Sequence, residues 1–112
     1  MTKTLLLYAT APDASTAEAI AAALIEARLA ACVNIIPGMR SVYRWRGAVE
    51  TAEEMVVIVK TTSETAENAR NLICDRHPYE TPCVIALEVS ENASSAAYLD
   101  WILKETKTAA SQ

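Results

Sequence analysis

The hydrophobic positions of this chain change their spacing several times, and each change marks a new predicted element. Residues 3–10, KTLLLYAT, form a short apolar run that Pro12 ends, which is typical of a buried central strand. Along residues 14–31 the apolar positions recur three and four residues apart, which predicts a helix with one face against a core. Ser15 and Glu18 have the spacing of a capping box, so this helix is expected to begin at Ser15.

The segment 32–62 is rich in β-branched and aromatic residues and predicts two long strands. Arg46 and Gly47 are expected to form the turn between them. Pro37 and Gly38 interrupt the first of these strands. Because proline has no N–H to donate, this strand should lie at a sheet edge and bend or bulge at that point. Alternation along the same strand predicts one face formed by Ser41, Tyr43 and Trp45.

The last third of the chain predicts two more helices and one more strand. Ser63 is expected to cap a second helix over residues 64–76, and Pro78 prevents that helix from continuing. Residues 83–90, CVIALEVS, predict a fourth strand. Helical spacing then predicts a third helix that contains Tyr98, Leu99 and Ile102.

The order of elements, β-α-β-β-α-β followed by a helix, is that of the split βαβ or ferredoxin-like fold of the α+β class. Its antiparallel sheet has the usual order 4-1-3-2, so strands 2 and 4 become edges and the helices cover one face. The other face also carries apolar side chains and needs cover from elsewhere. We expect one domain over residues 1–112, with an ordered core from about 3 to 105 and a small, polar tail, 106–112, that frays.

The composition excludes several classes of protein. Of 112 residues, 52% are hydrophobic and 21% charged, which is typical of a globular chain and not of a disordered one. A net charge of -4 argues against a nucleic-acid partner, and no apolar run is long enough to cross a membrane. Three widely spaced cysteines, Cys32, Cys74 and Cys83, predict reduced thiols in the cytoplasm. The motifs of serine hydrolases, zinc proteases and P-loop enzymes are missing, so we expect no enzyme.

The predicted sheet order brings three segments to one end of the fold: residues 10–12, the turn after the second strand, and residues 77–82. His77, the only histidine, is a candidate metal ligand through its imidazole, or a helix-capping residue. Glu80 is a candidate hard ligand, or a partner for a lysine of another subunit. Cys83 is a candidate thiolate ligand, or a buried free thiol at the start of an apolar strand.

Four further residues are candidates for a ligand-binding cleft between subunits: Tyr79, Trp45, Lys60 and Glu54. Each has a simpler alternative. The two aromatic rings could pack at a subunit interface, and Lys60 could bind an anion or be solvated. Glu54 lies with Glu50 and Glu53 in a group of carboxylates that could hold a hard cation, although a solvated face is the default expectation for such a group.

Four stretches of the chain together carry a family resemblance: LYATAPD, LAACVNIIPGMRSVYRWRG, VVIVKTT and HPYETP. In this order and spacing they closely resemble the CutA proteins, the divalent-cation tolerance family, from Leu5 to about Leu103. The resemblance implies a ferredoxin-like fold assembled as a tight homotrimer, similar in build to the PII signalling proteins. It also implies a link to tolerance of copper and other divalent metals, and some members of the family bind copper. Animal relatives are linked to anchoring of acetylcholinesterase.

The chain departs from the copper-binding members of that family at two positions. Those members carry a cysteine late in the first strand and a second histidine just before the His-Pro pair, where this chain has Ala9 and Arg76. Only His77 matches, so we expect copper or another divalent cation to be bound weakly. Three functions stay open: a trimeric metal-tolerance protein, a non-enzymatic signalling module that binds a small ligand in intersubunit clefts, and a structural assembly platform.

Overall fold

A computed structural model describes residues 1–107 of the chain. Within that part, the four strands form one antiparallel sheet in the order β2-β3-β1-β4, which confirms the predicted 4-1-3-2 order and the α+β fold class. Helices and strands follow one another as predicted: β1 (Thr4–Ala11), α1 (Ala14–Glu26), β2 (Cys32–Trp45), β3 (Ala48–Thr62), α2 (Ala66–Arg76), β4 (Val84–Glu88) and α3 (Ala96–Glu105).

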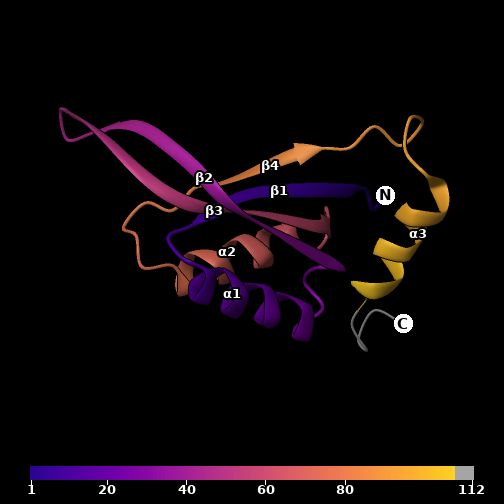
Figure 1. Cartoon of the computed structure of the whole chain (residues 1–112). Helices are drawn as coiled ribbons and strands as arrows, with labels where there is room; N and C mark the ends of the chain where they lie inside the picture. Colours follow the sequence, from indigo (N-terminus) through magenta and orange to yellow (C-terminus); the bar gives the residue numbers. More distant parts are fainter. Residues whose placement is uncertain (108–112) are drawn as a thin grey trace.

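The elements form two layers with a long projecting hairpin. Helices α1 and α2 lie side by side under one face of the sheet, and α3 lies beyond the end of the sheet near the N-terminus (Figure 1). The hairpin of β2 and β3 extends past the other strands, and the chain measures 48 × 29 × 22 Å along its principal axes. None of these helices is both long and apolar enough to span a bilayer.

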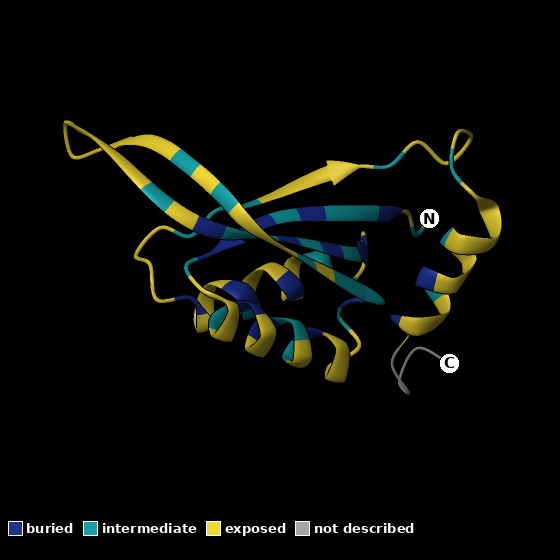
Figure 2. Ribbon diagram, viewed as in Figure 1, coloured by how far each residue is buried: buried dark blue, intermediate teal, exposed yellow. Residues whose placement is uncertain are grey.

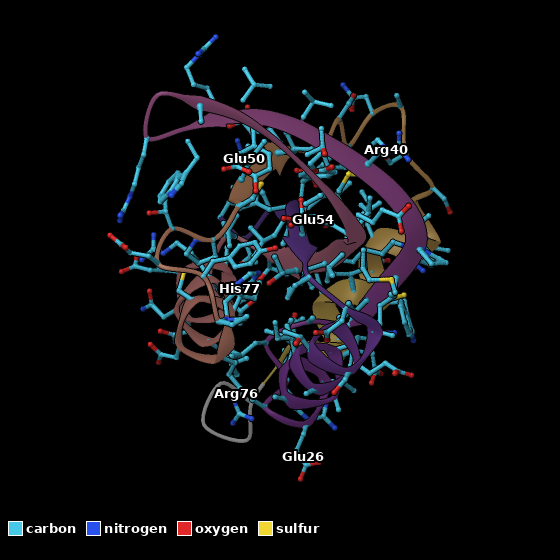
Figure 3. All side chains as sticks on the ribbon, turned by 60° about the vertical axis from the view of Figure 1, so that its left-hand side comes forward. Glu26, Arg40, Glu50, Glu54, Arg76 and His77 are labelled. Carbon is cyan, nitrogen blue, oxygen red and sulfur yellow. The ribbon has the colours of Figure 1, made fainter. Side chains whose placement is uncertain are left out.

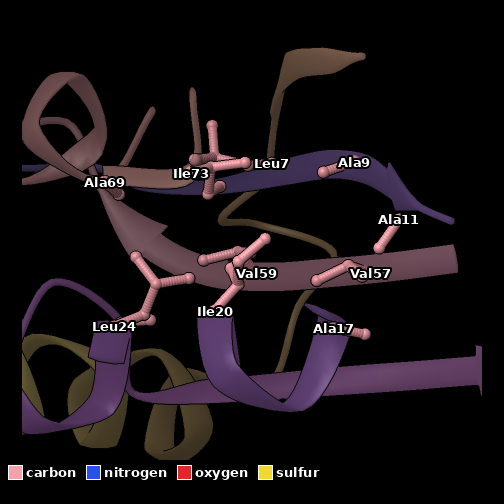
Figure 4. Close-up of a cluster of buried hydrophobic side chains, with 11 residues drawn as sticks. Leu7, Ala9, Ala11, Ala17, Ile20, Leu24, Val57, Val59, Ala69 and Ile73 are labelled. Carbon is pink, nitrogen blue, oxygen red and sulfur yellow. The ribbon is translucent and has the colours of Figure 1, made fainter. Parts of the chain in front are cut away.

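The hydrophobic core lies between the sheet and the two helices (Figure 4). Residues of β1 and β3 that share a face are paired across the strands, with Leu7 opposite Val59 and Ala9 opposite Val57. From the helix side, Ile20, Leu24 and Ile73 fill the space beneath them. Small residues allow the helices to lie close to the sheet, and those that are buried are Ala9, Ala11, Ala17, Ala30 and Ala69.

Residues 1–107 leave most of the opposite face of the sheet without cover. Alternation places Ile36 of β2 and Ile85 and Leu87 of β4 on this face, because Ile85 pairs with Tyr8 and Leu87 pairs with Leu6. These three aliphatic side chains are about half exposed, with Ile85 at 54%. Figure 2 shows β4 and most of the outer hairpin in the colour of exposed residues. We refer to this face, with Ile36, Ile85 and Leu87, as the open face.

The hairpin has the turn and the bulge that the sequence predicts. Trp45 pairs with Ala48, and the two turn residues between them, Arg46 and Gly47, have φ values of 51° and 82°. Two consecutive residues with positive φ are typical of a tight hairpin turn, and glycine adopts this conformation without strain. The register between β2 and β3 shifts between Ile36 and Met39, at the predicted Pro-Gly bulge.

The predicted helix caps are wrong. Helix α1 is capped two residues earlier than expected, because the Asp13 carboxylate accepts from the Thr16 N–H at 2.7 Å. Helix α2 begins after Thr65, whereas the Ser63 hydroxyl accepts from the Lys3 N–H at 2.9 Å and so ties the N-terminus to the end of β3. Both serines lie next to the true start of a helix, but a hydroxyl has several backbone donors within reach there.

The structure describes the C-terminal part of the chain as far as residue 107. Thr106 is buried, and its hydroxyl donates to the Ile102 carbonyl at 2.9 Å. Residues 108–112 of the predicted tail lie outside the described residues. The single domain over residues 1–112 stays a prediction.

Candidate functional site

Three segments meet beside the base of the hairpin, as the sheet order predicts. The end of β1 is joined to the α2–β4 loop, residues 77–83, by a hydrogen bond of 2.8 Å from His77 Nε2 to the Thr10 carbonyl. The hairpin turn is joined to the same loop by an ion pair of 3.3 Å between Arg46 and Glu80. Both side chains of that ion pair are exposed, so it positions the loop with little gain in stability.

These segments line an open cavity with a volume of about 640 Å³. A volume of this size is typical of small-molecule binding sites. Three of the four predicted cleft candidates line it, and so do two of the three predicted metal ligands, Glu80 and Cys83. The lining residues are Tyr8, Thr10, Ser41, Tyr43, Trp45, Arg46, Glu54, Tyr79, Glu80, Thr81 and Cys83.

Glu54 is the buried charged group of this cavity. It lies on β3 opposite Met39, and only 8% of its surface is exposed. Glu50 and Glu53 are exposed, so the expected solvated face holds for them and is wrong for Glu54. Figure 3 shows Glu54 toward the middle of the molecule, on the inner side of the curved hairpin. Among residues 1–107, no basic side chain forms an ion pair with its carboxylate.

The negative charge of Glu54 affects two neighbouring titratable groups, the phenol of Tyr79 and the thiol of Cys83. Burial raises the pKa of Tyr79 above its ordinary value of 10.0, and the Glu54 carboxylate raises it further. Burial and the same carboxylate also raise the pKa of the Cys83 thiol above 9.0. Both groups are therefore protonated at neutral pH, so Glu54 is the charge that they face. The cavity combines a carboxylate with a phenol and a thiol that stay neutral.

His77 lies behind the cavity and not in its lining. The residue is 8% exposed, and both ring nitrogens make hydrogen bonds. Nδ1 accepts from the Tyr79 N–H at 3.1 Å, so the ring proton is on Nε2, which donates to the Thr10 carbonyl. The ring also packs against the Tyr79 ring, with 4.7 Å between centroids. In this arrangement His77 fastens the loop to β1, and a metal ion at either nitrogen would replace one of these bonds.

The predicted metal ligands do not assemble into one group. Residues 1–107 contain no cluster of three or more His, Cys, Asp and Glu side chains that could hold a metal ion. His77 is bonded to backbone, Glu80 pairs with Arg46, and Cys83 lines the cavity. Cys74 is exposed on α2, and Cys32 lies at the opposite end of the sheet, as predicted. The ligand roles of His77, Glu80 and Cys83 stay predictions.

Lys60 does not lie with the other cleft candidates. It is paired with Cys32 at the far end of β3, where its ammonium donates to the Tyr98 hydroxyl at 3.1 Å. That hydrogen bond raises the pKa of Lys60 above 10.5. The ammonium is also 5.1 Å from the centre of the Tyr98 ring. Lys60 therefore links β3 to α3 within the described chain.

Sequence reasoning missed two aromatic walls of the cavity, Tyr8 and Tyr43. A signal for Tyr43 was present, because alternation placed it on the same face as Trp45. No pattern in β1 indicated that Tyr8 would face the cavity. Its position depends on the register with which Tyr8 pairs with Ile58 on one side and Ile85 on the other.

Comparisons with known proteins agree with one another. The family described as CutA1 divalent ion tolerance protein matches residues 5–105. A relative from Thermus thermophilus named divalent-cation tolerance protein CutA is 42% identical over 97 residues, which are 87% of this chain and 92% of that protein. A relative of the same name from Archaeoglobus fulgidus is 43% identical over 86% of this chain and 91% of its own length.

The solved structures agree with this family match. The crystal structure of CutA from Xylella fastidiosa is 39% identical in sequence and superposes with a TM-score of 0.90. The superposition covers 94% of this chain and 99% of that one. Identity at this level together with nearly complete coverage means that the fold described above is the one that these relatives share.

Proposed function

The chain belongs to the CutA1 divalent ion tolerance family, and from that premise we propose that it is a homotrimeric, cytoplasmic, non-enzymatic protein of divalent-cation tolerance. The observation that carries this proposal is the family match over residues 5–105, which includes all or nearly all of every element of the fold. Relatives named for divalent-cation tolerance support the physiological role. Its assembly, metal binding and location are inferred from particular residues of the chain.

The open face supports a trimer. A sheet face with half-exposed Ile36, Ile85 and Leu87 is unfavourable in water, and burial of the exposed half of each such side chain contributes about 1 kcal/mol. The edges β2 and β4 also present unpaired backbone groups, which favour pairing with another chain. An edge of one copy can pair with the other edge of the next, and such a head-to-tail contact generates a ring if the rotation between copies closes.

We propose that the protein binds copper or another divalent cation weakly. One chain provides no preassembled group of ligands in residues 1–107, and a metal at His77 must replace a hydrogen bond to Thr10 or Tyr79. The Cys83 thiol must lose its proton before it can act as a thiolate ligand, and its pKa is raised. Both requirements lower the affinity. Three free cysteines support a location in the reducing cytoplasm.

A test of the physiological role is complementation. A bacterium that lacks its own family member would be grown in rising copper concentrations with this protein or with an empty vector, and fractionation of the same cells would locate the protein. The proposal expects restored growth. Growth that remains as poor as with the empty vector, while the protein is present and folded, would contradict a role in tolerance.

The second candidate function, a small-ligand module, is favoured by the cavity of about 640 Å³. It lies beside the open face, so neighbouring copies of a trimer would form its outer side. Tyr79, Trp45 and Glu54 would then contact the ligand, as predicted for a cleft between subunits. A calorimetric screen of small organic ions tests it, and a screen in which nothing binds would refute it.

A further inference from the structure

We propose that the cavity at the hairpin base binds a small organic ammonium ion, with Glu54 as its counter-ion and the rings of Tyr43, Trp45 and Tyr79 as its walls. This inference rests on the second candidate function, to which it adds the chemical class of the ligand. It depends on neither the copper proposal nor the tolerance role.

The charge of Glu54 is the first argument. The residue is more than nine-tenths buried, and no basic group in residues 1–107 pairs with its carboxylate. A carboxylate that has lost most of its water is costly unless a cation or hydrogen-bond donors compensate for it. The neutral phenol of Tyr79 can offer one donor. A cation in the cavity would supply the missing charge.

The aromatic lining is the second argument. Tyr8, Tyr43, Trp45 and Tyr79 all contribute to the cavity, and the faces of such rings attract cations, most strongly when the site excludes water. Trp45 already makes one contact of this kind, since the Arg46 guanidinium lies 5.5 Å from its ring centre. Arg46 is held at the rim by Glu80, so it leaves the interior to a ligand.

The donor set distinguishes an organic cation from a metal ion. A hard divalent cation requires about six oxygen ligands, and a soft cation requires thiolates or imidazoles. The cavity offers one buried carboxylate, and the Cys83 thiol is held neutral by burial and by Glu54. No histidine lines it. One negative charge surrounded by aromatic rings is instead the combination that binds ammonium groups.

The charge balance of the lining also argues against an anion. Arg46 is the one cation in the lining, and Glu80 already pairs with it. An anion would therefore meet the field of Glu54 without compensation. A neutral apolar ligand would fit the rings but would leave the carboxylate unpaired, so it should bind more weakly than a cation of the same shape.

The test compares three probes of one shape and different charge by calorimetry on the full-length protein in its solution assembly. Choline is the cation, 3,3-dimethyl-1-butanol is its neutral isostere, and 3,3-dimethylbutanoate is the anion. We expect choline to bind and the other two to bind roughly tenfold more weakly or not at all, because a desolvated cation–aromatic contact and an ion pair are both lost.

Two variants locate the site. Glu54→Gln keeps the shape and removes the charge, and should weaken choline binding roughly tenfold or more. Glu53→Gln is the matched control, since Glu53 is the preceding carboxylate, exposed and 3.9 Å from Arg40, and should leave choline binding unchanged. Trp45→Leu removes an exposed ring at the hairpin end and should also weaken choline binding. This variant locates the site if thermal melting shows that Glu54→Gln does not fold.

Each other outcome overturns the inference. Equal binding of choline and the neutral isostere would make the cavity an apolar site, and the second candidate function would survive. Unchanged choline binding in Glu54→Gln or Trp45→Leu would move the ligand elsewhere. If none of the probes binds and Glu54→Gln weakens the assembly, a side chain of a neighbouring copy fills the cavity. If none binds and the assembly is unaffected, the cavity has no ligand role.

Discussion

Replacement of His77 by alanine should destabilise the fold by about 2–4 kcal/mol, whatever its effect on metal. The substitution removes two hydrogen bonds, to the Thr10 carbonyl at 2.8 Å and from the Tyr79 N–H at 3.1 Å. Each bond contributes about 0.5–1.5 kcal/mol, and a buried group left without its partner costs about 1–3 kcal/mol. Thr10 is buried, whereas Tyr79 is in contact with solvent, so most of the cost should come from the Thr10 carbonyl.

Two conservative variants separate the bonds. An amide at position 77 can replace one ring nitrogen: His77→Gln can reach the Thr10 carbonyl as Nε2 does, and His77→Asn can accept from the Tyr79 N–H as Nδ1 does. We therefore expect the order of stability wild type, Gln, Asn, Ala. Urea denaturation at one fixed protein concentration measures it, because assembly makes stability depend on concentration.

The control for this series is Arg76→Ala. Arg76 is exposed at the last turn of α2, next to His77, and its loss should change the free energy of unfolding by no more than about 0.5 kcal/mol. The reasoning would be refuted if His77→Ala were no more destabilising than Arg76→Ala, or if Gln and Asn restored nothing.

Three further predictions test other parts of the structure. Ile85→Glu on the open face should dissociate the assembly in light scattering, whereas Ile25→Glu should not, since Ile25 is a comparably exposed isoleucine on α1. Equal masses for both variants would remove the open face from the interface. Asp13→Ala should lower the melting temperature at neutral pH. Because the cap holds the pKa of Asp13 below 3.8, the wild-type protein should stay more stable than the variant above pH 3.8 and should lose this advantage as the pH falls further. A difference in stability that survives in acid would contradict the cap. Iodoacetamide should alkylate exposed Cys74 faster than Cys83, whose pKa is raised, when each peptide is followed by mass spectrometry at pH 8; the reverse order would be inconsistent with the protonated, half-buried thiol.

The sequence was sufficient for the fold because its signals are local and agree with one another. The helical and alternating patterns fix the element order, and Pro37 with Gly38 marks the bulge that the register shift between Ile36 and Met39 confirms. The Arg46-Gly47 pair likewise marks the turn. Caps were harder, because Ser15 and Asp13 both offer an oxygen near the start of α1 and only the backbone conformation selects Asp13.

The site was only partly predictable because it depends on pairing between distant strands. Topology alone brought the end of β1, the hairpin turn and the 77–83 loop together. That Glu54 is buried while Glu53 is exposed follows from the register of β3 after the bulge, which no local pattern determines. The hydrogen bond of His77 depends on how closely the Thr10 carbonyl approaches its ring, and the sequence does not give that distance. A metal-binding histidine and a structural histidine therefore look alike in the sequence.

Native mass spectrometry of protein purified without an affinity tag tests the proposed function most directly. It reports the number of chains in the assembly and the mass of anything bound, under one condition and in one spectrum. We predict three times the 12.1 kDa mass of one chain, with divalent metal that is bound in part and lost on mild chelation while the trimer persists. A species with the mass of a single chain, or a trimer that takes up no divalent cation even when copper is added, would contradict the account.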